Sequence, residues 1–229
     1  MTGAPGAEDT LDRKTITALI AMGVAVLVVA NDFTAMTVAL PSIESDLHTD
    51  LSTVQWVVNA YALVFGVLVV TGGRLADTYG RRTLFVIGAG VFAGFSVLGG
   101  LATEAWWLLA CRALMGIGGA MMVPVGRLIV ARNTPKQGFV SAMAWLTMPA
   151  LLGPVLGPLV GGIIVTNYPW HWIFLINIPI GILCLTLALA LLPREAPRPV
   201  GRFDGWGFVL SGLALSALML GSMEMTEMA

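Results

Sequence analysis

The stretch Gly72–Arg82, GGRLADTYGRR, places three arginines and one aspartate between two long apolar runs. An apolar helix of about 20 residues spans the hydrocarbon core of a bilayer. The flanking runs have this character, so the pattern predicts two membrane-spanning helices joined by a charged turn. Gly73 and Gly80 flank the turn and supply the backbone freedom that a reversal of the chain needs.

The composition of the whole chain supports a membrane protein. Of its 229 residues, 57% are hydrophobic and 11% are charged, and this is about half the charged fraction of a soluble domain. The 27 glycines and 12 prolines form no low-complexity tract, and membrane helices tolerate both residue types. The predicted fold class is therefore an all-α integral membrane protein.

Seven apolar runs are candidates for membrane-spanning helices. They are Ile16–Leu40, Val54–Gly72, Thr83–Leu101, Ala105–Val130, Phe139–Thr166, Trp172–Leu192 and Gly205–Leu220. The first run is too long for a signal peptide and no small-residue cleavage site follows it, so we expect a retained span. The predicted division is a cytoplasmic N-terminal tail (1–15), a six-helix transmembrane bundle (16–192), a cytoplasmic linker (193–204), and a seventh transmembrane helix with its outer end (205–229).

The basic residues predict the orientation of the chain. Of the 12 Lys and Arg residues, only Arg112 lies deep inside a predicted span. The others, including Arg127 at the end of the fourth span, share one side of the predicted membrane. Loops rich in Lys and Arg stay in the cytoplasm. We therefore expect a multi-pass protein of the plasma membrane, the inner membrane of a bacterium, with a cytoplasmic N-terminus.

Several other classes of protein lack support in the sequence. Cys111 and Cys184 lie inside spans, and no metal-ligand spacing occurs. No phosphate-binding G-x-x-x-x-G-K-[ST] loop is present, which argues against ATP hydrolysis. No basic patch lies outside the predicted inside loops. We expect no enzyme activity, no cofactor, no metal and no binding of nucleic acid.

Two charged residues lie deep inside predicted spans, where a charge is costly and suggests function. Asp32 lies about 12 Å below the outer end of the first span, and Arg112 lies about 10 Å below the outer end of the fourth. The matching depths predict that the side chains meet if these helices face each other. The pair is either a static contact that fixes packing or a titrating site whose proton affinity depends on conformation and water access.

The fifth span contains a regular pattern of small residues, GPVLGPLVGG, at residues 153–162. Its glycines recur every four residues and therefore line one face of a helix. Pro154 and Pro158 remove backbone donors and bend the helix. The pattern indicates at least a seam for close helix packing.

These segments resemble motifs of the major facilitator superfamily, in the fourteen-spanner drug:proton antiporter branch of EmrB/QacA type. The GGRLADTYGRR turn resembles the loop signature G-x-L-A-D-r-x-G-r-k, with Thr78 where a basic residue is common. NDFTAMTVALPSI resembles the helix 1 signature, from which Asn31 and Met36 depart. GPVLGPLVGG resembles the antiporter signature, and WHWIFLINIPIG resembles the helix 6 entry, with His171 replacing an arginine. The resemblance covers roughly residues 14–222.

The resemblance implies the N-terminal six-helix bundle of such a transporter, built from two inverted three-helix repeats, plus a seventh transmembrane helix. It implies proton-coupled export, by antiport, of small amphipathic compounds of the multidrug type. The expected partners are a small-molecule substrate, protons, the lipid bilayer and a C-terminal half of the transporter. Two alternatives stay open: export of a specific metabolite such as an organic acid or metal chelate, with Arg112 binding the anion, and a truncated membrane protein that does not transport.

The resemblance also implies roles for particular residues. Proton coupling falls to Asp32 and Arg112, and we expect both to face a cavity that a second bundle covers. Helix 5 is expected to bend and to seal against the other half through Gly153, Pro154, Gly157, Pro158, Gly161 and Gly162. A cytoplasmic gate is expected at Gly73, Leu75, Asp77, Gly80, Arg81 and Arg82. Candidates for a substrate cavity lined by helices 1, 2, 4 and 5 are Asn59, Tyr61, Met115, Trp145 and Met148.

Overall fold

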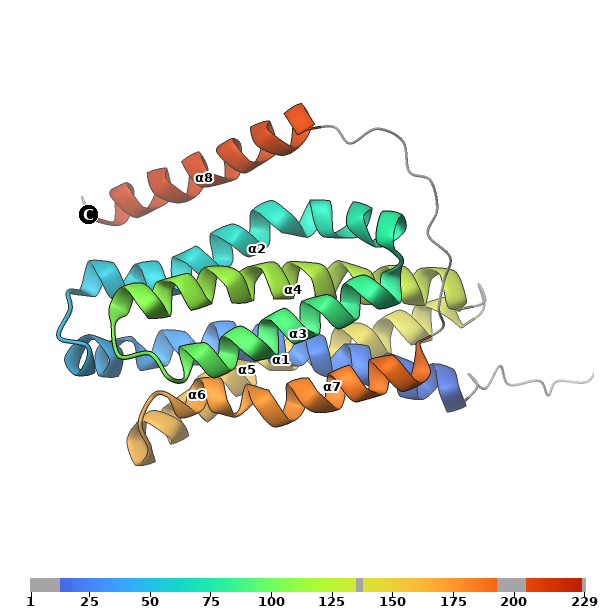
Figure 1. Ribbon diagram of the computed structural model, residues 1–229, viewed down its shortest axis with the longest axis horizontal. Coiled ribbons are helices and arrows are strands. Elements are labelled where there is room, and N and C mark those ends of the chain that lie inside the picture. Colours follow the sequence, from blue (N-terminus) through green and yellow to red (C-terminus); the bar gives the residue numbers. More distant parts are fainter. Residues whose placement is uncertain (1–12, 135–137, 193–204, 228–229) are drawn as a thin grey trace, which may run out of the picture.

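The computed structural model describes residues 13–134, 138–192 and 205–227, and these ranges contain helices and no strand. The predicted linker at 193–204 and most of the predicted N-terminal tail lie outside them. Figure 1 shows the arrangement of the helices. The helices are α1 (Arg13–Asp46), α2 (Leu51–Tyr79), α3 (Arg81–Gly99), α4 (Ala105–Asn133), α5 (Phe139–Asn167), α6 (Trp172–Leu175), α7 (Asn177–Leu191) and α8 (Gly205–Glu227).

The predicted all-α membrane architecture is confirmed. Within the described ranges, six helices are long and apolar enough to cross a membrane, with α6 and α7 together forming the sixth. The predicted seventh span corresponds to α8, whose apolar stretch Gly205–Leu218 is shorter. The chain is therefore a multi-pass membrane protein.

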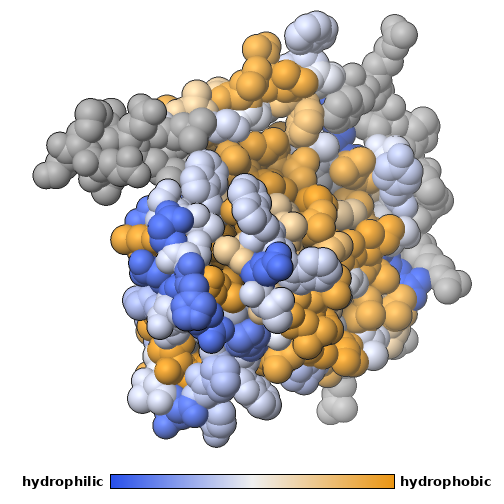
Figure 2. Space-filling model, turned by 60° about the vertical axis from the view of Figure 1, so that its left-hand side comes forward, coloured by the Kyte–Doolittle hydropathy of each residue, from blue (hydrophilic) through white to orange (hydrophobic). Residues whose placement is uncertain are grey.

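Successive long helices run in opposite directions, so their connections gather at two ends (Figure 1). We call one the acidic end; it holds the loops 47–50, 100–104 and 168–171. The other is the basic end, where α2 meets α3 and where α4 ends. Figure 2 turns the acidic end forward and shows hydrophilic residues gathered there, beside a broadly hydrophobic flank. This distribution fits a bundle with its flank in lipid.

Two helices extend beyond their predicted ends. We predicted that the first would stop at Leu40, but α1 continues through Pro41 to Asp46. Ile43 lies in this extension and is fully buried in the core, so packing outweighs the single backbone donor that the proline removes. The segment we predicted as a joint between the first two helices is therefore largely helical.

The charged turn is also shorter than predicted. Residues 73–79 form the last turns of α2, and Gly80 alone separates α2 from α3. The backbone of Gly80 has φ 89° and ψ 134°, a combination that residues with a Cβ rarely adopt. One glycine therefore makes the whole reversal.

The beginning of α2 carries a capping interaction. Asp50 accepts hydrogen bonds from the Thr53 amide at 3.1 Å and from the Thr53 hydroxyl at 2.7 Å. These bonds stabilise the charged carboxylate and lower the pKa of Asp50. An aspartate at this position satisfies a backbone donor that the helix leaves free.

Helix α4 packs between α2 and α3, and α1 packs most extensively on α5. Small residues permit these contacts. A Cβ on Gly72 would overlap the carbonyl of Ala120, and a Cβ on Gly118 would lie 2.7 Å from the carbonyl of Gly88. The pairing of α1 with α5 mirrors that of α2 with α4, as expected for two inverted repeats of three helices.

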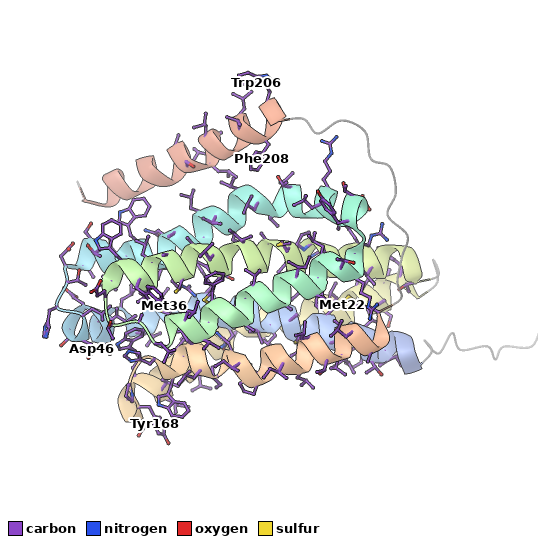
Figure 3. All side chains as sticks on the ribbon, in the orientation of Figure 1. Met22, Met36, Asp46, Tyr168, Trp206 and Phe208 are labelled. Atoms are coloured by element: carbon purple, nitrogen blue, oxygen red, sulfur yellow. The ribbon has the colours of Figure 1, made fainter. Side chains whose placement is uncertain are left out.

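Helix α8 packs on α2 and lies apart from the other helices in Figure 1. Phe208 points toward α2 and Trp206 points away from it (Figure 3). Gly212 allows close approach, since a Cβ there would lie 3.2 Å from a methyl group of Val67. The core of the protein therefore lies within α1–α7, with α8 at its side.

Candidate functional site

Asp32 of α1 and Arg112 of α4 form an ion pair between Oδ2 and Nη1. The pairing that their depths predict is therefore present. Neither side chain has any exposed surface. Arg112 Nε also lies 3.4 Å from the carbonyl oxygen of Val57 on α2. Arg112 Nη2 is buried and makes no hydrogen bond within the described part of the chain.

The local sequence explains how three helices converge on this pair. Gly116 lies one turn after Arg112 on α4, and a Cβ there would lie 2.8 Å from the carbonyl oxygen of Tyr61. The missing side chain lets α2 approach α4 closely, which brings the Val57 carbonyl within reach of the guanidinium. The close approach of α2 and α4 thus provides one backbone acceptor for a charge that is buried away from water.

The polar cluster is larger than the sequence predicted. Asn177, at the start of α7, donates from Nδ2 to Asp32 Oδ1 at 2.8 Å and to Ser96 Oγ at 3.3 Å. Ser96 of α3 donates in turn to the carbonyl oxygen of Phe174 at 2.9 Å. Both side chains are buried. We predicted a site role for neither residue, although Asn177 lies in the WHWIFLINIPIG motif and an uncharged polar residue inside an apolar span was a usable signal.

Tyr61 connects the ion pair to an apolar pocket. Its ring centroid lies 4.4 Å from Cζ of Arg112, a cation–π arrangement. Its hydroxyl is buried and has no hydrogen-bond partner among the described residues. The pocket has a volume of about 300 Å³ and lies between α1, α2 and α4, where it is lined by Val26, Val29, Ala30, Phe33, Tyr61, Ala62, Phe65 and Val123.

The five residues predicted to line a substrate cavity do not converge. Tyr61 lines the apolar pocket, whereas Met115 is fully buried in the core. Asn59 is half-buried on α2. Trp145 and Met148 are exposed on α5, at 55% and 61%. The sequence gives residue types suited to apolar ligands, but not the helix faces on which they lie.

The glycines of α5 face α1 of the same bundle. A Cβ on Gly157 would overlap Oγ1 of Thr34, and one on Gly161 would lie 2.7 Å from the carbonyl oxygen of Ala35. The sealing against a second half that we expected of these residues is therefore wrong for Gly153, Gly157 and Gly161. Gly162 has no atom within 4 Å of such a Cβ. Pro154 and Pro158 are exposed.

The arginines of the charged motif at the basic end make their contacts inside the bundle. Arg81 is buried and pairs with Asp77 at 2.9 Å, so this arginine does not reach lipid phosphates. Arg82 donates to the carbonyl oxygen of Leu189 on α7. Leu75 and Gly73 are half-buried on the last turns of α2. The motif thus ties the turn at Gly80 to α7.

A second cavity lies at the acidic end and was not predicted. Its volume is about 710 Å³, and Trp170 forms part of its wall and donates to Asp46 at 2.9 Å. Figure 3 shows Asp46 and Tyr168 at this end of the bundle. Among the described residues, no group of three or more His, Cys, Asp or Glu could hold a metal ion. The cavity is lined by Pro41, Ser42, Ser45, Asp46, His48, Val165, Tyr168, Pro169, Trp170 and His171.

Comparison with known proteins places this bundle among transporters. Residues 22–226 match the family profile of the Major Facilitator Superfamily. The chain is 40% identical over 189 residues to the "Putative multidrug resistance protein MdtD" of Escherichia fergusonii and of Escherichia coli. Each match covers 82% of this chain and 40% of the relative, so the chain spans about 40% of the length of these curated relatives.

Solved structures share the fold at low sequence identity. The proton:xylose symporter XylE, bound to 6-bromo-6-deoxy-D-glucose, matches with a TM-score of 0.66 at 15% identity, over 79% of this chain and 45% of that chain. A bacterial homologue of the human lysosomal transporter Spinster, in an inward-facing unoccupied conformation, matches with a TM-score of 0.63 at 21% identity, over 85% and 47%. These likenesses concern the fold alone.

Proposed function

Because the chain belongs to the Major Facilitator Superfamily of membrane transporters, we propose that it provides the proton site of an exporter of small amphipathic compounds. In this proposal the exporter is an antiporter, and protons entering the cell drive the substrate out. The printed name of the relatives at 40% identity, multidrug resistance protein, supports a substrate of this kind. The acidic end faces outward and the N-terminus is cytoplasmic, as the distribution of basic residues suggests.

The observation that carries the proposal is the position of Tyr61. Its ring contacts the guanidinium of Arg112 and also lines the apolar pocket. A ligand in the pocket therefore contacts a side chain that contacts the ion pair. Occupancy of the pocket and protonation of Asp32 influence each other through this single residue. Mutual influence of this kind is what an exchange of proton for substrate requires.

Asp32 is the group that takes up the proton. Its carboxylate is buried, which favours the neutral form, and it is paired with Arg112, which favours the charged form. A small change in the distance to Arg112, or in the access of water, shifts the balance between these opposing effects. The charge on Arg112 persists throughout, because a guanidinium does not release its proton in proteins.

The remaining motifs serve the conformational change. The turn at Gly80, tied to α7 by Arg82, belongs to a cytoplasmic gate. The α1–α5 seam keeps Asp32 on a rigid pair of helices as the bundle moves. A second helix bundle covers the exposed face of α5, because alternating access rocks two bundles around a central site. The greater length of the curated relatives supports such a partner.

The sign of a proton exchange tests the proposal. The purified chain in lipid nanodiscs, in weakly buffered solutions at a series of pH values on both sides of the point at which Asp32 becomes protonated, is mixed with the lipophilic dye ethidium while a pH indicator is followed. Competition between dye and proton predicts proton release. Asp32→Asn should bind the dye without release, and empty nanodiscs provide the control. Dye binding with no exchange of protons in the unaltered chain would contradict antiport at Asp32.

One observation favours a second candidate, export of a specific organic acid or its metal chelate. Arg112 Nη2 is buried without a hydrogen-bond partner among the described residues, so its N–H groups are available to donate to an anion. An anion bound there would compete with Asp32 for Arg112, and the released carboxylate would take up a proton. Citrate added in the same assay should then cause proton uptake, which is the opposite sign to that expected with ethidium.

A further inference from the structure

We propose that Asn177 is a positioning residue that transmits the charge state of Asp32, by way of Ser96, to the break between α6 and α7. The inference rests on the proposed proton site at Asp32. It concerns two residues that lie outside the motifs assigned to proton coupling, gating and the α1–α5 seam. Its basis is a chain of hydrogen bonds that has two arrangements, one for each charge state of Asp32.

The first arrangement is the one in the structure. The amide of Asn177 has two N–H donors, and they point to Asp32 Oδ1 at 2.8 Å and Ser96 Oγ at 3.3 Å. The Ser96 hydroxyl donates its own proton to the carbonyl oxygen of Phe174 at 2.9 Å. Asp32 Oδ2 is held by Arg112. Every donor in this series of hydrogen bonds has an acceptor when Asp32 Oδ1 carries no proton.

The second arrangement follows when Oδ1 of Asp32 takes up a proton. A donor from Asp32 would then face a donor from Asn177, and one must turn away. Rotation of the amide by half a turn places its oxygen where its nitrogen was. That oxygen has two lone pairs, so it accepts from both Asp32 and Ser96. The proton stays on Asp32, and no covalent bond to hydrogen breaks. The two N–H groups of Asn177 leave Asp32 and Ser96, and the Phe174 carbonyl loses the Ser96 hydroxyl.

The segment that loses this bond contains a break in the helix. Ile176 separates α6, which has four residues, from α7. Pro179 has no N–H, so the carbonyl of Leu175 lacks the donor that a continuous helix would provide. The bond from Ser96 to Phe174 therefore anchors the break to α3. Its loss frees the break to move on protonation of Asp32.

Other titratable groups do not account for the same switch. Among the described residues, the charged and titratable side chains that face Asp32 are Arg112 from α4 and Tyr61 from α2. Helix α5 faces α1 with glycines. Helices α3 and α7 contribute the uncharged Ser96 and Asn177. Arg112 stays charged in both arrangements, so Asp32 is the group whose charge changes.

Two measurements on the full chain in nanodiscs test the proposal. Infrared difference spectra follow the carboxyl C=O band of Asp32, identified by its absence in Asp32→Asn. Hydrogen exchange of the peptide spanning 172–178 is measured at each pH relative to Asp32→Asn, which removes the intrinsic pH dependence of exchange. In the unaltered chain, exchange should accelerate over the same pH range in which the carboxyl band appears.

Variants separate a positioning role from a structural one. Asn177→Leu removes a donor to the charged form, so the proton affinity of Asp32 should rise about tenfold and exchange should no longer follow it. Ser96→Ala keeps the bond between Asn177 and Asp32; the carboxyl band should stay nearly unchanged while exchange becomes fast at every pH. Asn167→Leu, at an exposed asparagine of α5, is the matched control and should change neither.

The outcomes distinguish this inference from the proposed function. A carboxyl band that titrates without any change in exchange at 172–178 overturns the relay and leaves the proton site intact. A normal pH response of exchange in Ser96→Ala also overturns the relay, and this variant decides the matter if Asn177→Leu does not fold. The absence of a carboxyl band for Asp32 at every accessible pH overturns the proton site and the relay together.

Discussion

Asp32 and Arg112 form their ion pair inside a single six-helix bundle, and neither side chain is exposed on its surface. The sequence predicts instead that the two charges face a cavity which a second bundle covers. That expectation is wrong, because Tyr61 covers one side of the pair and Asn177 covers another. The bundle therefore shields its own charges, and the energetic consequences of breaking the pair can be measured on this chain alone.

Asp32→Asn should abolish proton exchange while the chain still inserts and folds, although the Arg112 charge loses its counter-charge and stability falls. Asparagine can accept from Arg112 and occupies nearly the same volume, but it cannot take up a proton near neutral pH. We expect ethidium binding within a few-fold of the unaltered chain and no proton release. Pulse labelling of newly made Asp32→Asn protein should show that it inserts into the membrane as the unaltered chain does. Persistent proton release on dye binding would locate the site elsewhere.

Arg112→Ala should be far more destabilising than Arg112→Lys. The alanine leaves the Asp32 carboxylate buried without a partner, and this costs about 3–5 kcal/mol. Lysine restores the charge, although it loses the contact of Nε with Val57 and the stacking on Tyr61. Unfolding in mixed micelles would compare the two variants. Equal and mild effects would mean that the ion pair contributes only to packing.

Gly157→Leu should separate α1 from α5, since even a Cβ would overlap Thr34. Overpacking of this kind costs at least about 1–3 kcal/mol, and Gly161→Leu should behave alike. Gly162→Leu is the matched control, because the space around it is open. Stability in micelles and dye binding should fall in the first two variants and remain normal in the third. Normal behaviour of Gly157→Leu would remove the α1–α5 seam from the mechanism.

Tyr61→Phe should leave the protein as stable as before or raise its stability by about 1 kcal/mol. The hydroxyl is buried without a hydrogen-bond partner among the described residues, and such a group costs about 1–3 kcal/mol. The ring, its contact with Arg112 and the pocket are all retained. Tyr168→Phe, at an exposed position, is the control and should be neutral. A clear loss of stability in Tyr61→Phe would show that the hydroxyl has a partner.

Gly80→Ala should destabilise the turn between α2 and α3. The backbone there has φ 89°, and a residue with a Cβ pays about 1–3 kcal/mol to adopt such a conformation. Gly73→Ala is the control, because Gly73 lies within α2 and a Cβ there would make an ordinary contact, 3.8 Å from Leu128. Thermal unfolding of both variants would test the difference. Equal stability would mean that the turn relaxes without cost.

The sequence predicts the polar cluster only in part. Asp32 and Arg112 stand out because a charge in an apolar span is rare, and their pairing follows from depth along antiparallel helices. Asn177 and Ser96 carry no charge. Ser96 is one polar residue in an apolar run, and the WHWIFLINIPIG motif that contains Asn177 does not identify its partners. The contact of Asn177 with Asp32 joins residues 145 positions apart along the chain, and its contact with Ser96 joins residues 81 positions apart. No local pattern encodes such a contact.

The sequence by itself determined the membrane class, the order of the helices, and the depth at which two charges meet. These properties depend on hydrophobicity and on rise per residue, which are local. Only the tertiary structure decided which face of each helix meets a neighbour: the glycines of α5 on α1, Tyr61 between ion pair and pocket, and Trp145 and Met148 on the exposed side of α5. In a bilayer the outward face of a helix is as apolar as its packed face, so hydrophobic periodicity does not distinguish them. Close packing across the whole bundle distinguishes the two faces.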